Sequence, residues 1–310
     1  MRILVFGAGA TGGYFGGRMI EGGVDATFFV RPGRAEKLKQ TGLVIKSAFG
    51  GDLSIPAPIA TEADPGGPYD AVLLSCKAYD LESALSALTP AVGPETLIIP
   101  ILNGMRHLDA ISSHFGAHRT LGGICLISSS LDGDGRIIHH NDKHAVIFGE
   151  RAGGSSPRVE ALAKALQPAK MEIRLSIDIM QEMWDKWVFL APLAATTCLM
   201  RAAVGDVVTA AGPEFALGFV AECETVARAN SHPQNEQQIA WIRNTLTQAG
   251  SPIMASMMRD VERGGPVEAD HVIGDMIQRG GGARKMPLMQ LAYQHLKAYE
   301  ARRKREESAV

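Results

Sequence analysis

Residues 1–23 read MRILVFGAGATGGYFGGRMIEGG, a short apolar run followed by more glycines than a helix normally tolerates. The first six residues are rich in branched apolar side chains, which predicts a buried strand. The next six spell G-x-G-x-x-G and are Gly7, Ala8, Gly9, Ala10, Thr11 and Gly12. The pattern therefore sits at a strand-to-helix turn, the setting in which it indicates a dinucleotide-binding site.

Each glycine of this pattern has its own physical task. A glycine at position 7 permits the tight turn after the strand, and one at position 9 lets backbone N–H groups approach a pyrophosphate. A glycine at position 12 lets the helix lie close to the sheet, so that the phosphates meet the positive end of the helix. The alternative is a glycine-rich turn without a ligand, which the strands before and after the helix disfavour.

The end of the second predicted strand, DATFFV, indicates which dinucleotide binds. NAD-binding proteins commonly carry Asp or Glu there to accept the ribose 2′-hydroxyl, whereas Arg accommodates a 2′-phosphate. Here Arg31 follows the strand, then Pro32, Gly33 and Arg34, and no carboxylate stands at the tip. The sequence therefore predicts NADP(H), with Arg31 on the 2′-phosphate. A surface arginine without a ligand is the alternative.

The hydrophobic pattern changes at residue 176 and divides the chain into two parts. Up to residue 176, short apolar runs alternate with helical or polar segments, which predicts β-α-β units and a mostly parallel sheet. These runs are ILVFG, DATFFV, DAVLLSCK, TLIIPILNG, TLGGICLISSS, HAVIFGE and MEIRLS. Long amphipathic stretches then predict helices to the end. We expect an α/β fold with a Rossmann-like, doubly wound domain over residues 1–176 and an all-helical domain over residues 177–310.

The composition narrows the class of partner. The chain has 31 basic and 33 acidic residues and a net charge of −2, which favours neither nucleic acid nor an anionic membrane surface. Its four cysteines are scattered, so neither a disulfide framework nor a metal site is expected. No stretch reaches the ~20 apolar residues of a membrane span, and no signal peptide is recognisable. We therefore expect a cytoplasmic protein with a small-molecule partner, and we allow for a homodimer.

Three further clusters place polar residues where a ligand would lie. LLSCKAYD puts Lys77 at the end of one predicted strand, and ILNGM puts Asn103 at the end of the next. The carboxyl ends of strands in a doubly wound sheet face the ligand crevice, so both side chains should point at the bound cofactor. WDKW puts Lys186 early in the first helix of the second half. A solvated lysine at either position, or a plain Asn-Gly turn, is the alternative.

Together with SMMRDVERGGPVEAD at residues 256–270, these clusters make the chain resemble the ketopantoate reductase (2-dehydropantoate 2-reductase) family over essentially its whole length. The resemblance implies NADPH-dependent reduction of a 2-oxo acid to a 2-hydroxy acid, in pantothenate biosynthesis. It implies cofactor contacts from Lys77, Asn103 and Glu268. It also implies that Asn103, Lys186 and Ser256 bind the substrate, with Ser256 holding its carboxylate.

The proton donor follows from the reaction. Hydride addition to a 2-oxo acid leaves an alkoxide, which needs a general acid beside it. By resemblance Lys186 is the catalytic lysine, and its apolar neighbours Trp184 and Trp187 argue against a solvated helix lysine. The role of Glu268 is less defined, because Glu262 and Asp270 lie close to it in the sequence.

The chain departs from the family at the substrate site. Positions four and eight residues after Lys186 share its helix face, and the family pattern has Asn at both. This sequence has Leu190 and Ala194 instead, and an apolar wall selects weakly for a substrate hydroxyl. Thr196 or Thr197 could replace the lost amides. The substrate is therefore expected to be 2-dehydropantoate or a related, more apolar 2-oxo acid.

Two alternatives to this function stay open. One is a hydroxy-acid or opine-type dehydrogenase that works in the oxidative direction. The other is a catalytically silent NADP-binding protein that senses redox state or scaffolds a partner. A lysine at position 186 disfavours the second alternative, because a sensor needs no acid in its cleft.

Overall fold

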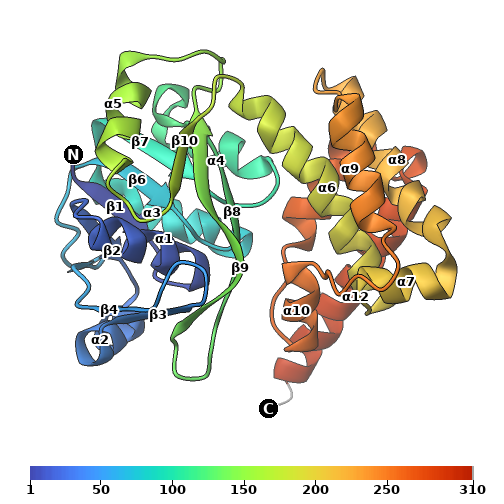
Figure 1. The fold of residues 1–310 in the computed structure, drawn as a ribbon, viewed down its shortest axis with the longest axis horizontal. Helices are drawn as coiled ribbons and strands as arrows, with labels where there is room; N and C mark the ends of the chain where they lie inside the picture. Colours follow the sequence, from blue (N-terminus) through green and yellow to red (C-terminus); the bar gives the residue numbers. More distant parts are fainter. Residues whose placement is uncertain (309–310) are drawn as a thin grey trace. The chain divides into compact units, whose positions relative to one another are not determined.

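The computed structural model describes residues 1–308, and the chain divides into two compact units. The first unit comprises residues 1–102 and 107–180, and the second comprises residues 103–106 together with the chain from residue 181. Figure 1 labels the elements of both units. The segment 103–106 lies in the N-terminal half of the sequence and yet belongs to the helical unit, which the sequence patterns did not indicate.

The first unit contains a parallel sheet of five strands in the order β5-β2-β1-β6-β7. Their bounds are β1 Ile3–Phe6, β2 Ala26–Phe29, β5 Ile59–Ala60, β6 Tyr69–Leu74 and β7 Val92–Pro100. Strand β1 is central, because Ile3 pairs with Ala26 of β2 on one side and with Ala71 of β6 on the other. Since all five run parallel, the loops after β1, β2 and β6 meet at one edge of the sheet.

A second sheet has the order β10-β9-β3-β4, and β8 also pairs with β9. Its strands are β3 Leu43–Ser47, β4 Leu53–Ile55, β8 Gly122–Leu131, β9 Ile137–Gly149 and β10 Glu172–Leu175. Strands β8 and β9 are antiparallel, as are β3 and β4, so this sheet is mixed. All seven predicted strands form, whereas β3, β4 and β5 were not predicted. Strands β4 and β5 have only three and two residues, which give little periodicity to detect.

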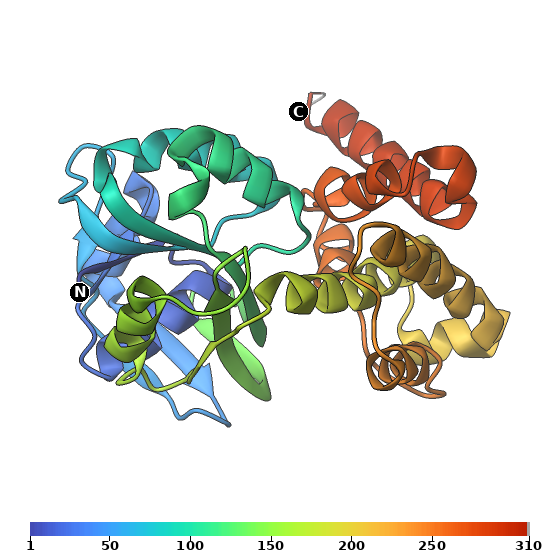
Figure 2. The same cartoon turned by 90° about the horizontal axis from the view of Figure 1, so that it is seen from above.

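Helices cover both faces of the parallel sheet, as the doubly wound prediction requires (Figure 2). They are α1 Ala10–Glu21, α2 Pro32–Thr41, α3 Leu81–Leu88, α4 Arg106–Phe115 and α5 Pro157–Leu166. Side chains of β1 alternate between two cores: Ile3 and Val5 pack with α1, whereas Leu4 packs with α3 and α4. Short 3₁₀ turns span Ala78–Asp80, Thr89–Ala91 and Ala117–Arg119.

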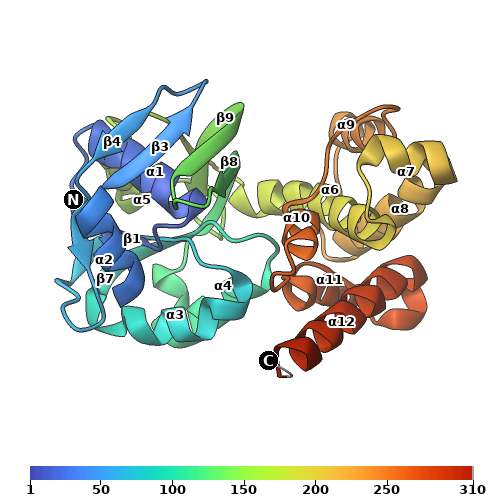
Figure 3. The same cartoon turned by 90° about the horizontal axis from the view of Figure 1, so that it is seen from below.

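The second unit is helical, as predicted. Its α-helices are α6 Ile179–Met200, α7 Val204–Ala211, α8 Pro213–Ala229, α9 Glu236–Leu246, α10 Ser256–Glu262, α11 Asp275–Arg279 and α12 Pro287–Glu307. A π-helical turn, Asp270–Gly274, precedes α11, and a 3₁₀ turn, Ala283–Lys285, precedes α12. Helix α6 runs between the α7–α9 group and the α10–α12 group, so its middle is buried on nearly every side (Figure 3).

The length and hydropathy of the helices can be compared with those of a membrane span. Within the described residues, no single helix is long and apolar enough to cross a membrane. Helices α6 and α7 reach that length and hydropathy only as a pair, bent by 66° at the break between them.

Candidate cofactor and active site

The turn after β1 needs glycine at its first position. Gly7 has a φ of +93°, in the region that disfavours other residues. A Cβ at this position would also stand 2.6 Å from the carbonyl oxygen of Ser75, in the loop after β6. The backbone N–H of Gly7 donates to the carbonyl of Phe29, which ties the turn to β2. The turn is therefore held between the ends of β2 and β6.

The third glycine allows the helix to approach the turn. A Cβ on Gly12 would lie 2.2 Å from the carbonyl oxygen of Gly7 and 3.0 Å from the hydroxyl oxygen of Ser75. The first of these neighbours is backbone, which cannot rotate away as a side chain can. Glycine at position 12 is therefore required by the protein's own packing, as the sequence predicts.

Gly9 differs from its two neighbours in the pattern. Its φ of −80° and ψ of −164° suit any residue, and a Cβ there would meet no protein atom within 4 Å. Neither backbone strain nor internal packing explains a glycine here. What remains is open space beside the N-terminus of α1, and the residues fit a bound pyrophosphate.

The N-terminus of α1 has donors available for that space. Gly9 is the N-cap residue of α1, and no side chain caps the helix. The first N–H groups of a helix have no partner within the helix, and they carry the positive end of its dipole. The backbone of residues 10–12 can therefore hold an anion at this turn.

Two arginines follow β2, and the structure separates their roles. Arg34 donates from Nε to the carbonyl of Ala8 at 3.0 Å, and from Nη1 and Nη2 to the carbonyl of Gly135 at 3.4 Å. The guanidinium of Arg34 is thus hydrogen-bonded to the backbone of the glycine turn. Arg31 is 74% exposed, and its Nη2 donates to Oδ1 of Asp80 at 2.8 Å. This bond raises the pKa of Arg31.

Asp80 was missed by the sequence reading, which found no carboxylate at the tip of β2. The carboxylate comes instead from the loop after β6, at the end of the turn Ala78–Asp80. The signal was available, because Asp80 stands three residues after Lys77 in a loop that was already singled out. Lys77 itself is half-buried at the carboxyl end of β6, where it was predicted.

Asn103 follows β7 and lies with the helical unit. The next residue, Gly104, has a φ of +78°, and a Cβ on it would stand 3.0 Å from the carbonyl oxygen of His271. The ring of His271 is hydrogen-bonded to the backbone of Asn103, and burial lowers the pKa of this histidine to about 4. A neutral imidazole in the π-helical turn therefore holds the Asn103 segment.

Lys186 stands half-buried on α6, next to a buried tryptophan. The indole Nε1 of Trp187 donates to the carbonyl of Val272 at 2.9 Å. This bond ties α6 to the π-helical turn, a type of irregularity that is frequent at functional sites. No sequence signal predicted the turn.

Ser256 and Glu268 lie on segments that flank α6. Ser256 is the first residue of α10, and the preceding Ala255 donates its N–H to Oγ1 of Thr197 in α6 at 3.4 Å. Glu268 lies just before the π-helical turn and is 8% exposed. Helix α6 is thus bonded to the start of α10 and to the turn after Glu268.

The structure distinguishes the three carboxylates near the C-terminus. Glu262 and Asp270 are exposed, whereas Glu268 is buried. Asp270 accepts from the hydroxyl of Tyr293 at 2.6 Å and from Nζ of Lys297 at 3.1 Å. Of the three, Glu268 is the one whose burial suits an enclosed site.

The face of α6 that follows Lys186 is apolar. Leu190 is half-buried and Ala194 is 1% exposed. Thr196 and Thr197, the two residues suggested as replacements for the lost amides, each use their hydroxyl proton on the backbone of α6. Thr196 donates to the carbonyl of Pro192 and Thr197 to that of Leu193, each at 2.7 Å, and both are buried.

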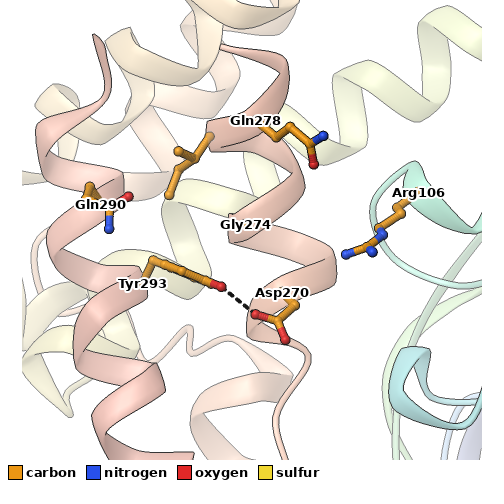
Figure 4. Close-up of a pocket in the computed structure, with 7 residues that line it drawn as sticks. Arg106, Asp270, Gly274, Gln278, Gln290 and Tyr293 are labelled. Atoms are coloured by element: carbon orange, nitrogen blue, oxygen red, sulfur yellow. Dashed lines mark hydrogen bonds between the residues drawn. The ribbon is translucent and has the colours of Figure 1, made fainter. Parts of the chain in front are cut away.

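A pocket of about 260 Å³ lies in the helical unit beside the π-helical turn (Figure 4). Its lining comprises Arg106, Asp270, Gly274, Ile277, Gln278, Gln290 and Tyr293. Arg106 points toward Asp270 across the opening. None of the described residues predicted for the active site is in this lining.

Comparison with known families matches both halves of the chain. The family described as ketopantoate reductase PanE/ApbA matches residues 3–153, and the family described as its C-terminal part matches residues 178–300. A curated relative, the uncharacterized oxidoreductase YkpB of Bacillus subtilis (strain 168), is 37% identical over 306 residues. The match covers 97% of this chain and 99% of that protein.

Solved structures show the same fold. A 2-dehydropantoate 2-reductase from Methylococcus capsulatus superimposes with a TM-score of 0.86 at 27% identity, over 98% of both chains. A D-mandelate dehydrogenase, solved with NADH and anilino(oxo)acetate, superimposes with a TM-score of 0.85 over 98% of this chain and 99% of that one. Its identity is 19%, so this likeness concerns the fold alone.

Proposed function

Because the chain belongs to the ketopantoate reductase family, an oxidoreductase family, we propose that it reduces a 2-oxo acid to the 2-hydroxy acid with NADPH. The observation that carries the proposal is the open space at Gly9, at the uncapped N-terminus of α1. Every other glycine of the pattern is accounted for by packing or by φ. The open space at this one supports a bound ligand.

The cofactor is bound through the first unit. Backbone N–H groups at the start of α1 hold its pyrophosphate, and Arg31 interacts with the 2′-phosphate. By analogy with the family, Lys77, Asn103 and Glu268 would also contact the cofactor. When bound, NADPH supplies the hydride that reduces the C2 carbonyl of the substrate.

Lys186 supplies the proton. Hydride addition places negative charge on the carbonyl oxygen, and an ammonium group within hydrogen-bond reach stabilises that charge and then donates a proton to it. Asn103 and Ser256 orient the substrate, with Ser256 holding its carboxylate. The bond of Trp187 to Val272 fixes the turn of α6 that carries Lys186.

We expect the preferred substrate to be less polar than ketopantoate. Leu190 and Ala194 offer no amide to a hydroxyl group, and the neighbouring threonines are bonded to backbone carbonyls. This apolar face favours branched 2-oxo acids without a hydroxyl.

A substrate panel tests the proposal. Purified protein is mixed with NADPH and ketopantoate or a series of branched 2-oxo acids, and the loss of NADPH absorbance is followed. We expect at least one 2-oxo acid to be reduced by the wild type and not by Lys186→Ala. Binding of NADPH without turnover of any acid, in either direction, would favour the silent NADP-binding protein. A role in pantothenate biosynthesis requires ketopantoate to be the preferred substrate. The cytoplasmic location and the homodimer stay predictions.

A further inference from the structure

The ion pair of Arg31 and Asp80 joins two loops on opposite sides of the glycine turn. Arg31 follows β2 and Asp80 follows β6, and these two strands flank β1. The glycine turn follows β1 at the same edge of the sheet. The pair therefore lies where the adenosine end of a dinucleotide would enter.

The carboxylate of Asp80 is oriented by this pair and not by a helix cap. Asp80 is the N-cap residue of α3, but its side chain makes no capping hydrogen bond there. Its side chain is 34% exposed, against 74% for Arg31, so both groups can be reached from solvent. Replacing this carboxylate removes a charge beside Arg31. It does not remove a capping hydrogen bond from α3, because Asp80 makes none.

We propose that Asp80 is a specificity-determining residue that weakens the preference of this chain for NADPH over NADH. The inference rests on the proposed function, because it concerns the cofactor of that reaction. A 2′-phosphate that approaches Arg31 meets a guanidinium already paired with a carboxylate. It must displace that carboxylate or remain beside it, and both cost binding free energy.

The same arrangement favours the cofactor without the phosphate. A ribose 2′-hydroxyl can donate a hydrogen bond to a carboxylate, which is how Asp or Glu selects NAD in this class of fold. Asp80 offers that carboxylate from the loop after β6 in place of the usual position at the end of β2. With NADH bound, Arg31 keeps its partner and no like charges approach each other.

Charge removal at constant shape is the direct test. Asp80→Asn keeps the size of the side chain and removes its charge, and Asp80→Ala serves as a second variant. We expect the ratio of the NADH Kd to the NADPH Kd to rise about two- to fivefold in both variants, a range set by the weak coupling of exposed charge pairs. The rise should shrink at high salt, because exposed charges are screened.

Glu82→Gln is the matched control, since Glu82 is an exposed carboxylate two residues along α3. It removes the same charge from the same helix without touching the pair. Calorimetric titrations with NADPH and NADH are run on all four proteins. Adenosine 2′,5′-bisphosphate and adenosine 5′-monophosphate are titrated in parallel, because they probe the adenosine end alone.

The outcomes separate the inference from the function. An unchanged ratio in both Asp80 variants overturns the inference, and so does an equal rise in Glu82→Gln, which would mean a general effect of net charge. In either case tight binding of NADPH leaves the proposed function standing. If neither cofactor binds to the wild type, the proposed function fails, and the inference fails with it.

Discussion

Replacing Gly9 by valine should weaken cofactor binding about a hundredfold and leave the fold intact. The backbone of Gly9 has an extended conformation that valine adopts readily, and a Cβ there meets no protein atom within 4 Å. Two small effects on stability oppose each other. Loss of glycine freedom in the unfolded chain stabilises by ~0.4–1 kcal/mol, whereas an apolar N-cap residue costs about as much. The free energy of unfolding should therefore change by less than about 1 kcal/mol.

The effect on binding should be far larger. The valine side chain occupies the space through which a pyrophosphate reaches the N–H groups of α1. Losing two charge-assisted hydrogen bonds, at ~1.5 kcal/mol each, removes ~3 kcal/mol, which is about a hundredfold in affinity. Gly12→Ala supplies the contrast, because its Cβ would stand 2.2 Å from the carbonyl oxygen of Gly7. It should destabilise the fold by ~1–3 kcal/mol, as overpacking does.

Two measurements on each variant decide the matter. Thermal unfolding without ligand reports the fold, and calorimetric titration with NADPH reports binding. Gly9→Val should unfold near the wild-type temperature and bind NADPH about a hundredfold more weakly than the wild type. Near-normal affinity in a folded Gly9→Val protein would refute the reasoning, because the open space would then serve something other than the cofactor.

Three further predictions concern the helical unit. Lys186→Ala should lower kcat by ~10²–10⁴ with little change in NADPH affinity. Lys186→Arg should not restore proton transfer. A wild-type kcat in the alanine variant would mean that another residue is the acid, and Lys77 would be tested next. Ketopantoate should be favoured no more than roughly tenfold over 2-oxo acids that lack its hydroxyl, because Leu190 and Ala194 are apolar; a preference of several orders of magnitude in kcat/KM would contradict this. Burial lowers the pKa of His271 from 6.5 to about 4, so the unfolded chain binds a proton that the native protein excludes between these values. Stability should be full above pH 6.5 and fall by about 3 kcal/mol toward pH 4 through this group, and urea unfolding of His271→Phe should show a weaker loss than the wild type over that window.

Features that depend on neighbouring residues were predictable from the sequence. The strand, turn and helix at the N-terminus follow from an apolar run and glycines at fixed spacing, because their roles depend on local backbone geometry. The seven predicted strands and the helices of the second half follow from apolar runs and periodicity. Lys77 could be placed at the end of β6 for the same reason, since a strand end is a local feature.

Features that depend on contacts between distant segments came only from the tertiary structure. The sequence by itself determined the glycine turn and the arginine at its side, but not that Asp80, 49 residues later, pairs with Arg31. It offered two threonines as replacements for lost amides, and only the folded helix showed their hydroxyls bonded to its own backbone. It gave no sign of the π-helical turn that joins Trp187 and the Asn103 segment. Periodicity and spacing report which residues share a face, whereas a partner across the fold is chosen by how the elements pack.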